Sequence, residues 1–180
     1  MSEKKLKTYN IMLSVVFPVT HPRKGQPTGF KDKVLRAVCK TGERYLSDIR
    51  PKVHTIRANY PLWKKRIEEV ERGEAEICLR QWTGKPYRSK TVELARLGKD
   101  DGIGIQKLTF DKDRDGVASI HLYNVDGCFP GMRLLAHNDG LSVDDWKAWF
   151  RGYDLSQPMA VIHFTPWRYT VESIKGQDIT

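Results

Sequence analysis

The apolar residues of this chain occur in short segments that Gly and Pro interrupt at irregular intervals, and this pattern limits the fold more than any other feature. Segments with alternating apolar residues are typical of strands, and segments with apolar residues three or four positions apart are typical of helices. We predict strands at 10–18, 52–57, 76–82, 91–97, 105–110, 117–123 and 159–165, and helices at 30–39, from about 60 to 73, and from about 142. Short strands with about three short peripheral helices predict an α+β fold, in which a mixed sheet closes or nearly closes into a β-barrel.

The length of 180 residues fits one domain with a substantial core. We assign residues 10–170 to this domain, 1–9 to a basic flexible tail and 171–180 to a polar C-terminal tail. The first apolar run is broken by Ser14 and Pro18 and lacks a cleavage site, and no run approaches the ~20 residues that span a bilayer. Three cysteines without CxxC spacing are typical of reduced thiols. We therefore expect a cytoplasmic protein without a membrane partner.

Positive charge is concentrated in the first third of the chain. Residues 1–57 contain 13 Lys and Arg against 4 Asp and Glu, whereas the remaining residues contain 18 of each class. A localised basic surface suits a polyanion such as nucleic acid. The alternative is that the excess lysine serves only solubility.

The segment 51–57 combines two cations, an imidazole and a hydroxyl on a β-prone backbone. In regular strand geometry Lys52 and His54 point to one side, and Thr55 and Arg57 point to the other. Because four of the six side chains from Lys52 to Arg57 are polar, a plain core strand is excluded. The segment is either a half-solvated edge or the rim of an anion-binding pocket.

A second cluster interleaves aromatic and cationic side chains within 80–90. Aromatic rings stack on bases while cations neutralise phosphates, so this pattern suits single-stranded nucleic acid. The alternative is a hairpin whose aromatic residues close one end of a barrel. The residues are Arg80, Trp82, Lys85, Tyr87, Arg88 and Lys90.

No pattern in the chain indicates a cofactor or a metal site. The segment 111–116 reads D-x-D-x-D-G, which is how a calcium loop of the EF-hand type begins, but Leu122 occupies the twelfth position, where a bidentate Glu belongs. We predict a turn whose Asp side chains bond local backbone. The histidines lack HxH or HExxH spacing, and His121 and His163, in apolar strands, are expected to be hydrogen-bonded core residues.

Three segments together resemble a known family. Lys52-x-x-Thr55-Ile56-Arg57 resembles the signature of ASCH domains, small β-barrels of the PUA-like superfamily associated with RNA and modified nucleosides. The segment 137–141, a short helix from Ser142 and the segment 160–165 follow in the order expected for the C-terminal half of such domains. The resemblance implies a cleft between Lys52–Arg57 and the corner at 138–140 that binds RNA or a modified nucleoside. The residues expected to contact nucleic acid are Lys52, His54, Arg57, Arg80, Trp82, Lys85, Tyr87 and Arg88.

The resemblance also implies a candidate catalytic trio. The family contains an acetylcytidine amidohydrolase with a lysine, a threonine and a glutamate, which correspond to Lys52, Thr55 and Asp139. A lysine kept neutral by burial and by Arg57 would deprotonate the Thr55 hydroxyl for attack on an amide carbonyl. Asp139 is one methylene shorter than glutamate, which puts its reach in doubt. A binding role for these residues without catalysis, with Asp139 as a turn residue, and a protein-interaction module without a small ligand are the alternatives.

Overall fold

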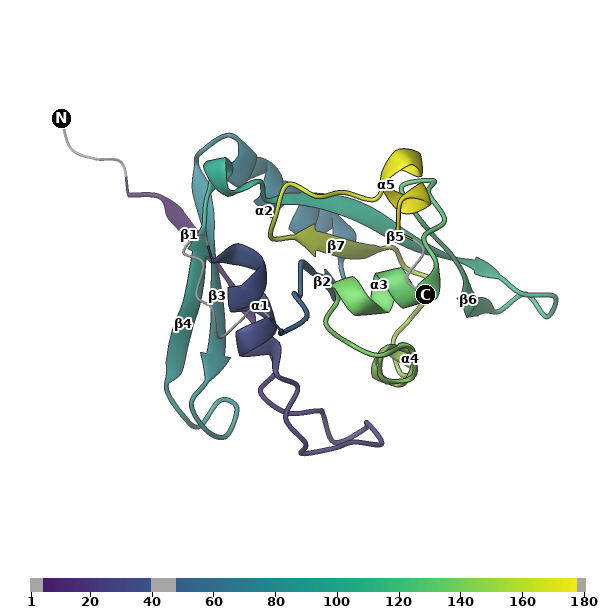
Figure 1. Ribbon diagram of the computed structural model, residues 1–180, viewed down its shortest axis with the longest axis horizontal. Helices are drawn as coiled ribbons and strands as arrows, with labels where there is room; N and C mark the ends of the chain where they lie inside the picture. The colour runs from purple at the N-terminus through teal and green to yellow at the C-terminus, as the bar shows by residue number, and fades with distance from the viewer. Residues whose placement is uncertain (1–4, 40–47, 178–180) are drawn as a thin grey trace.

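The computed structural model describes residues 5–39 and 48–177, and its strands form two sheets (Figure 1). The three-stranded sheet has the order β1-β3-β4. Its central strand pairs in parallel with β1 and antiparallel with β4. The strands are β1 (Lys7–Met12), β3 (Ala75–Trp82) and β4 (Thr91–Leu97).

The four-stranded sheet has the order β2-β7-β5-β6, and all its strands are antiparallel. The five residues of its inner strand β7 are all buried, as expected of a strand covered on both faces. Two sheets together with helices confirm the predicted α+β class. The predicted closure into one mixed barrel is seen only in part, because the strands are divided between two sheets and one of these curls into a half-barrel. The strands are β2 (His54–Arg57), β5 (Gly104–Lys112), β6 (Ala118–Val125) and β7 (Met159–His163).

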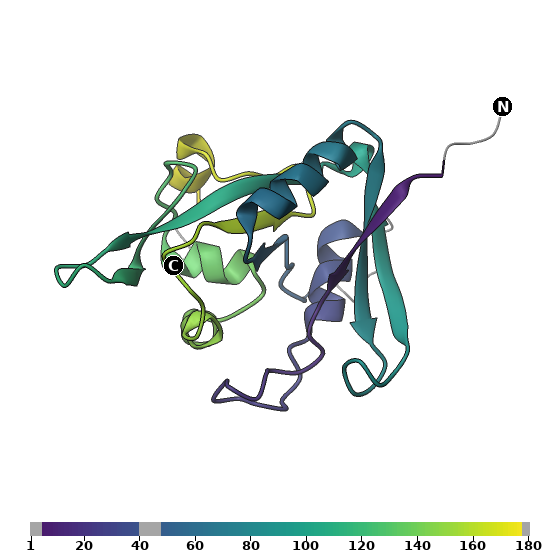
Figure 2. The ribbon, with the colours of Figure 1, turned by 180° about the vertical axis from the view of Figure 1, so that it is seen from behind.

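The described residues form five α-helices, where the sequence predicts about three. They are α1 (Phe30–Val38), α2 (Tyr60–Glu71), α3 (Met132–Asn138), α4 (Val143–Phe150) and α5 (Val171–Lys175), with a 3-10 turn at Lys99–Asp101. Helix α2 contacts β3 of one sheet and β5 and β7 of the other, and Figure 2 shows it lying across β5 and β7. Helices α3 and α5 are seven and five residues long, too short for their periodicity to stand out in the sequence.

The boundaries of α2 follow from local chemistry that the sequence reveals. The Asn59 side chain accepts a hydrogen bond from the Leu62 N–H, and Pro61 lies in the first turn, where its missing N–H costs nothing. Gly73, with φ of 73°, follows the end of the helix. The predicted start and end of this helix are therefore confirmed.

Both predicted tails contain regular structure. β1 begins at Lys7, inside the segment predicted as a flexible tail, because pairing with β3 fixes an edge that propensity alone leaves open. β1 also ends at Met12, so the strand predicted for 10–18 was placed too late. At the other end, helix α5 lies inside the predicted polar tail. Thr170, the residue before it, caps the helix by accepting a hydrogen bond from the Ser173 N–H. The closing strand β7 ends at His163, two residues earlier than predicted.

The turn at 111–116 has the local bonding that its sequence predicts. The Asp113 carboxylate accepts hydrogen bonds from the N–H groups of Asp115 and Val117. Gly116 has φ of 77°, a conformation that glycine adopts without a steric penalty. The Asp-rich motif is therefore a turn that joins β5 to β6.

Buried apolar side chains from both sheets form one cluster. Ile11 and Leu79 come from the three-stranded sheet, Val161 comes from the four-stranded sheet, and Ile67 of α2 joins them. Burial of each such side chain is worth roughly 1.5–3 kcal/mol, so this shared cluster is what holds the sheets together. Within the described ranges, no helix is both long and apolar enough to cross a membrane.

Candidate functional site

The residues just before β2 are anchored on three sides. The Lys52 N–H donates to the Lys33 carbonyl of α1, and the Val53 N–H donates to the Asn138 carbonyl at the end of α3. The Val53 carbonyl accepts from the N–H of Phe164, the residue after β7. These bonds bring the early cationic segment against the late corner at 138–140.

Lys52, Thr55 and Arg57 line the same pocket, although strict strand alternation predicts that Lys52 faces away from the other two. β2 begins only at His54, so Lys52 precedes the strand and does not follow its alternation. Thr55 and Arg57, two residues apart within β2, keep the common face that a strand requires. The irregularity therefore lies between Lys52 and His54.

Lys52 and Asp139 form a buried ion pair. The Lys52 Nζ lies 2.5 Å from Asp139 Oδ1 and 2.5 Å from the Asp139 carbonyl oxygen. Only 1% of Lys52 and 4% of Asp139 are exposed, and the Nζ also lies 4.4 Å from the centre of the Phe30 ring. The shorter carboxylate of Asp139 therefore reaches the lysine without the extra methylene of a glutamate.

Burial works against both charged forms of this pair. It lowers the pKa of Lys52; Asp139 opposes that shift, and the positive charges of Arg57 and Lys33 add to it. Burial likewise raises the pKa of Asp139, against the opposing effect of Lys52. Burial therefore disfavours the charged form of each group, and it is their contact with each other that opposes both shifts.

The corner that carries Asp139 requires a glycine at the next position. Gly140 has φ of 81°, and a Cβ on it would lie 3.2 Å from the Cβ and Cδ of Lys52. A side chain here would be strained by its backbone and would press on the lysine stem. The close approach of Lys52 to the corner thus depends on Gly140.

Two further polar groups of the pocket have unused bonding capacity. The Arg57 Nη2 donates to the Met12 carbonyl at 2.5 Å, whereas its Nε is buried without a hydrogen-bond partner in the described structure. The Thr55 side chain is 5% exposed, and its hydroxyl makes no hydrogen bond to a described residue. A donor and a hydroxyl are therefore available to a group that enters the pocket.

The pocket has a volume of about 110 Å³ and mixes polar and apolar walls. Drug-sized ligands occupy about 300–1,000 Å³, so this pocket fits one small group and not a folded nucleic acid. Trp149 and Phe150, predicted to be core residues, also line it; spacing in the sequence cannot distinguish the two roles. The lining residues are Leu13, Ser14, Phe30, Lys52, Thr55, Ile56, Arg57, Asp139, Leu141, Trp149, Phe150 and Tyr153.

His54, predicted to contact nucleic acid, lies behind the pocket instead. It is fully buried, its Nε2 lies 2.8 Å from the Tyr169 hydroxyl, and its Nδ1 lies 3.9 Å from Asp139 Oδ1. Burial holds its pKa well below 6.5, so the ring is neutral. The Asn138 amide donates to the same hydroxyl, and this buried network supports the corner from behind. The sequence gives no signal for the role of Tyr169.

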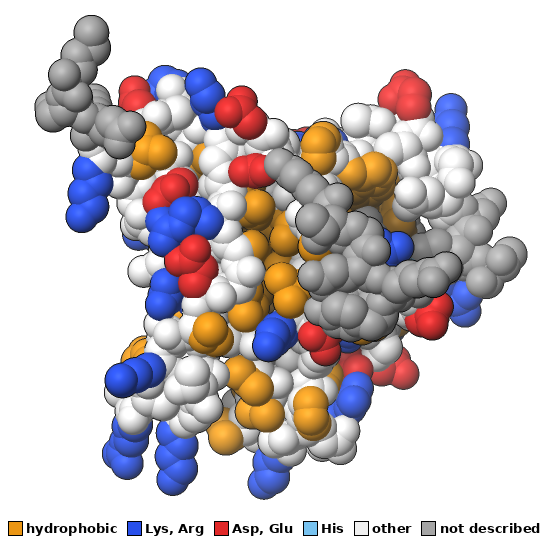
Figure 3. Space-filling model, turned by 60° about the vertical axis from the view of Figure 1, so that its left-hand side comes forward, with side chains coloured by type: hydrophobic (Ala, Val, Ile, Leu, Met, Phe, Trp, Pro, Cys, Tyr) orange, Lys and Arg blue, Asp and Glu red, His pale blue; other side chains and the backbone are white. Residues whose placement is uncertain are grey.

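The predicted aromatic and cationic cluster lies at the end of the β3–β4 hairpin, and none of its residues lines the pocket of Lys52 and Asp139. The rings of Trp82 and Tyr87 have centroids 5.3 Å apart, and Tyr87 is 90% exposed. Arg80 bonds Thr91 within the hairpin. In Figure 3, Lys and Arg side chains project from the lower edge of the molecule, below a hollow in which hydrophobic side chains are exposed. Lys85 and Arg88 are exposed in the same loop.

His121 and His163, expected to be hydrogen-bonded core residues, both differ from that expectation. His163 is fully buried, but neither ring nitrogen has a hydrogen-bond partner in the described structure, and His121 is exposed on β6. Among residues 5–39 and 48–177, no three His, Cys, Asp or Glu side chains are grouped as a metal ion would require.

No family model, curated protein or solved structure matches the chain.

Proposed function

We propose that the pocket between β2 and the 138–140 corner recognises a base of RNA or a modified nucleoside, within a PUA-like fold of the ASCH type. The observation that carries this function is that Lys52, Thr55 and Arg57 line one small cavity together with Asp139, which lies more than 80 positions later in the chain. Donors, an acceptor and a hydroxyl together match the mixed edge of a nucleobase. Apolar walls such as Phe150 exclude water and strengthen those bonds.

The pocket volume favours a single base, or its modifying group, over a paired helix. RNA-binding proteins recognise sequence mostly through unpaired bases whose edges are free. Bases flanking the bound one would stack on Trp82 and Tyr87 only if the strand extends to the β3–β4 hairpin. A free nucleoside needs the pocket alone.

Thr55→Val tests this function because valine keeps the shape of threonine and removes its hydroxyl. We expect the affinity for a preferred nucleoside, measured by calorimetry across a panel of modified nucleosides, to fall roughly five- to tenfold with an unchanged fold. Thr8→Val, on the exposed part of β1, is the matched control and should bind as the wild type does. Failure of every nucleoside and RNA in the panel to bind would refute a recognition role.

A second candidate is an amidohydrolase that acts on acylated cytidine-type nucleosides. Contact between Lys52 and Asp139, with an unengaged Thr55 hydroxyl in the same pocket, favours it. In the form of the pair in which the shared proton lies on Asp139, neutral Lys52 would take the Thr55 proton as Oγ1 attacks the amide carbonyl, and Asp139 would give its proton to the leaving amine. Water would then hydrolyse the Thr55 ester to the free acid and restore the hydroxyl, and the proton held by Lys52 would return to Asp139.

Turnover separates the two functions. In an enzyme, Thr55→Val and Lys52→Ala abolish release of the acyl group as a free acid, whereas Thr55→Ser retains part of it. In a pure binding protein, no acylated nucleoside in the panel is converted, although the pocket still binds one of them.

A further inference from the structure

Unbalanced positive charge surrounds a second cavity, which shares Leu141 with the base pocket. This second cavity has a volume of about 390 Å³, and three cationic side chains, Arg23, Lys33 and Arg50, line it. Asp145 is the one carboxylate among its lining residues, and it already pairs with Arg23 at 2.6 Å. Lys33 and Arg50 form no salt bridge with a described residue, so the wall keeps a net positive charge.

The cations of this wall repel one another. Burial lowers the pKa of Lys33, and the charges of Arg23 and Arg50 lower it further, against the opposing effect of Asp145. Burial also lowers the pKa of His137, and Arg50 and Lys33 add to that shift. A multivalent anion in the cavity would relieve this repulsion, because each cation would gain a counter-charge.

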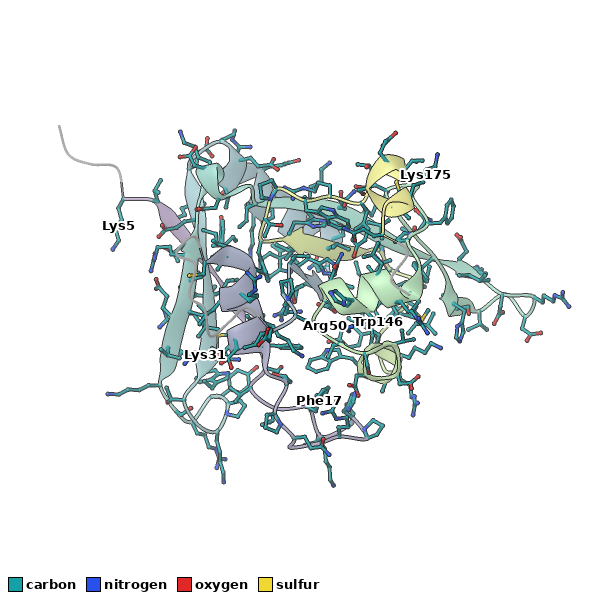
Figure 4. The ribbon with its side chains drawn as sticks, viewed as in Figure 1. Lys5, Phe17, Lys31, Arg50, Trp146 and Lys175 are labelled. Atoms are coloured by element: carbon teal, nitrogen blue, oxygen red, sulfur yellow. The ribbon has the colours of Figure 1, made fainter. Side chains whose placement is uncertain are left out.

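Two helix N-termini border the same cavity. Gly29, the residue before α1, and Ser142, the residue before α4, both line it. The partial positive charge at the start of a helix favours an anion and adds to the charge of the side chains. Figure 4 shows Arg50 between α1 and α3, with Phe17 on the loop below it.

The corner at 139–140 borders both cavities, because Asp139 lines the base pocket and Gly140 lines the second cavity. Lys52 bonds the carbonyl and carboxylate of Asp139 on one side, and Lys33 Nζ donates to the Gly140 carbonyl at 2.7 Å on the other. Leu141 lines both cavities. The two lysines also contact the same ring: the Nζ of Lys33 lies 5.9 Å and the Nζ of Lys52 lies 4.4 Å from the centre of Phe30.

We propose that the cavity lined by Arg23, Lys33 and Arg50 is a phosphate subsite, so that the ligand of the base pocket is a nucleotide. This deepens the proposed function, on which its nucleotide part rests. The phosphate belongs either to a free nucleoside monophosphate or to an RNA strand that passes over the corner. Both sources present the same anionic oxygens to the two arginines, which bind phosphate in a bidentate manner.

Calorimetry in a phosphate-free buffer tests the subsite with five probes: inorganic phosphate, cytidine, cytidine 5′-monophosphate, cytidine 3′-monophosphate and a short single-stranded RNA. We expect either monophosphate to bind at least tenfold more tightly than cytidine. A gain confined to the monophosphates identifies a free nucleotide, and a larger gain with the oligomer identifies RNA.

Arg50→Gln is the informative variant because Arg50 is exposed and forms no salt bridge with a described residue, so its loss should not unfold the protein. We expect it to weaken monophosphate binding roughly tenfold and to leave cytidine binding unchanged. Lys31→Gln is the control, because it removes the same charge outside the cavity. Lys31 is exposed on α1 and is labelled in Figure 4.

The outcomes separate the two ideas. Equal affinities for cytidine and its monophosphates, or equal losses in Arg50→Gln and Lys31→Gln, would overturn the phosphate subsite and leave base recognition standing. Binding of inorganic phosphate that depends on Arg50, without any nucleoside binding, would support the subsite and refute the proposed function.

Discussion

The ammonium of Lys52 lies 2.5 Å from the carboxylate of Asp139, 87 positions later in the chain. Neither side chain has appreciable contact with solvent. Removal of either partner leaves a buried charge or a buried donor, so the ion pair fixes the position of the 138–140 corner against the segment before β2.

Neutralisation of this pair gives a test of its energetic coupling. We expect Lys52→Met and Asp139→Asn each to lower the free energy of unfolding by about 3–5 kcal/mol, and the double variant to lose clearly less than the sum, because no unpaired charge remains. Urea denaturation of the four proteins measures the cycle. Glu68→Gln, which breaks the exposed Lys64–Glu68 pair on α2, should change stability little; additive losses at Lys52 and Asp139 would contradict the coupling.

Gly140→Ala tests the close approach at the corner. The strained backbone at φ of 81° and the contact of the new Cβ with Lys52 should cost about 1–3 kcal/mol of stability. If the proposed function holds, the same change should weaken nucleoside binding beside Lys52. Gly152→Ala is the control, because a Cβ at Gly152 meets no atom within 4 Å and its φ is not positive. Equal stability of the two variants would mean that the corner relaxes without disturbing Lys52.

The buried His163 predicts a loss of stability in mild acid. Its folded-state pKa is lowered to about 3, mainly by burial, whereas the unfolded chain titrates near 6.5. The unfolded state therefore takes up a proton that the folded state refuses, and stability present above pH 6.5 falls as the pH decreases towards 3, by about 1.4 kcal/mol per pH unit.

His163→Leu should flatten this pH dependence. Both ring nitrogens lack partners in the described structure, so leucine forfeits no hydrogen bond at neutral pH. His54 keeps a share of the acid sensitivity, because burial lowers its pKa as well. Unfolding free energies at pH 7 and pH 5 measure the slope, and His121→Gln, on the exposed face of β6, should keep the wild-type slope. An unchanged slope in His163→Leu would assign the acid sensitivity elsewhere.

The exposed ring of Tyr87 predicts a length-dependent effect on RNA. If a bound strand reaches the β3–β4 hairpin, Tyr87→Ala should weaken a short oligoribonucleotide by roughly tenfold, a typical loss for one stacked base. A mononucleoside, which ends in the pocket, should bind unchanged. Fluorescence anisotropy with oligomers of increasing length measures this, and Phe129→Ala removes an exposed ring outside the hairpin as the control.

Local sequence features predicted much of the fold. Asn59, Pro61 and Gly73 set the limits of α2, and the span predicted for β4 is the one observed. The short helices α3 and α5 were missed because each has fewer than two turns, too few for an apolar residue to recur on one face. The start of β1 was missed because its pairing with β3 is a contact between distant segments. Propensity describes only neighbours in the chain.

The sequence by itself determined which side chains were candidates for the site. Four of these candidates, Lys52, Thr55, Arg57 and Asp139, line the pocket. Only the tertiary structure decided their surroundings: it buried the ion pair, turned His54 away towards Tyr169 and placed the aromatic hairpin apart from the pocket. It also gathered Arg23, Lys33 and Arg50 around one cavity. Burial and the direction of a side chain depend on packing between elements far apart in the chain, and no local pattern records that packing.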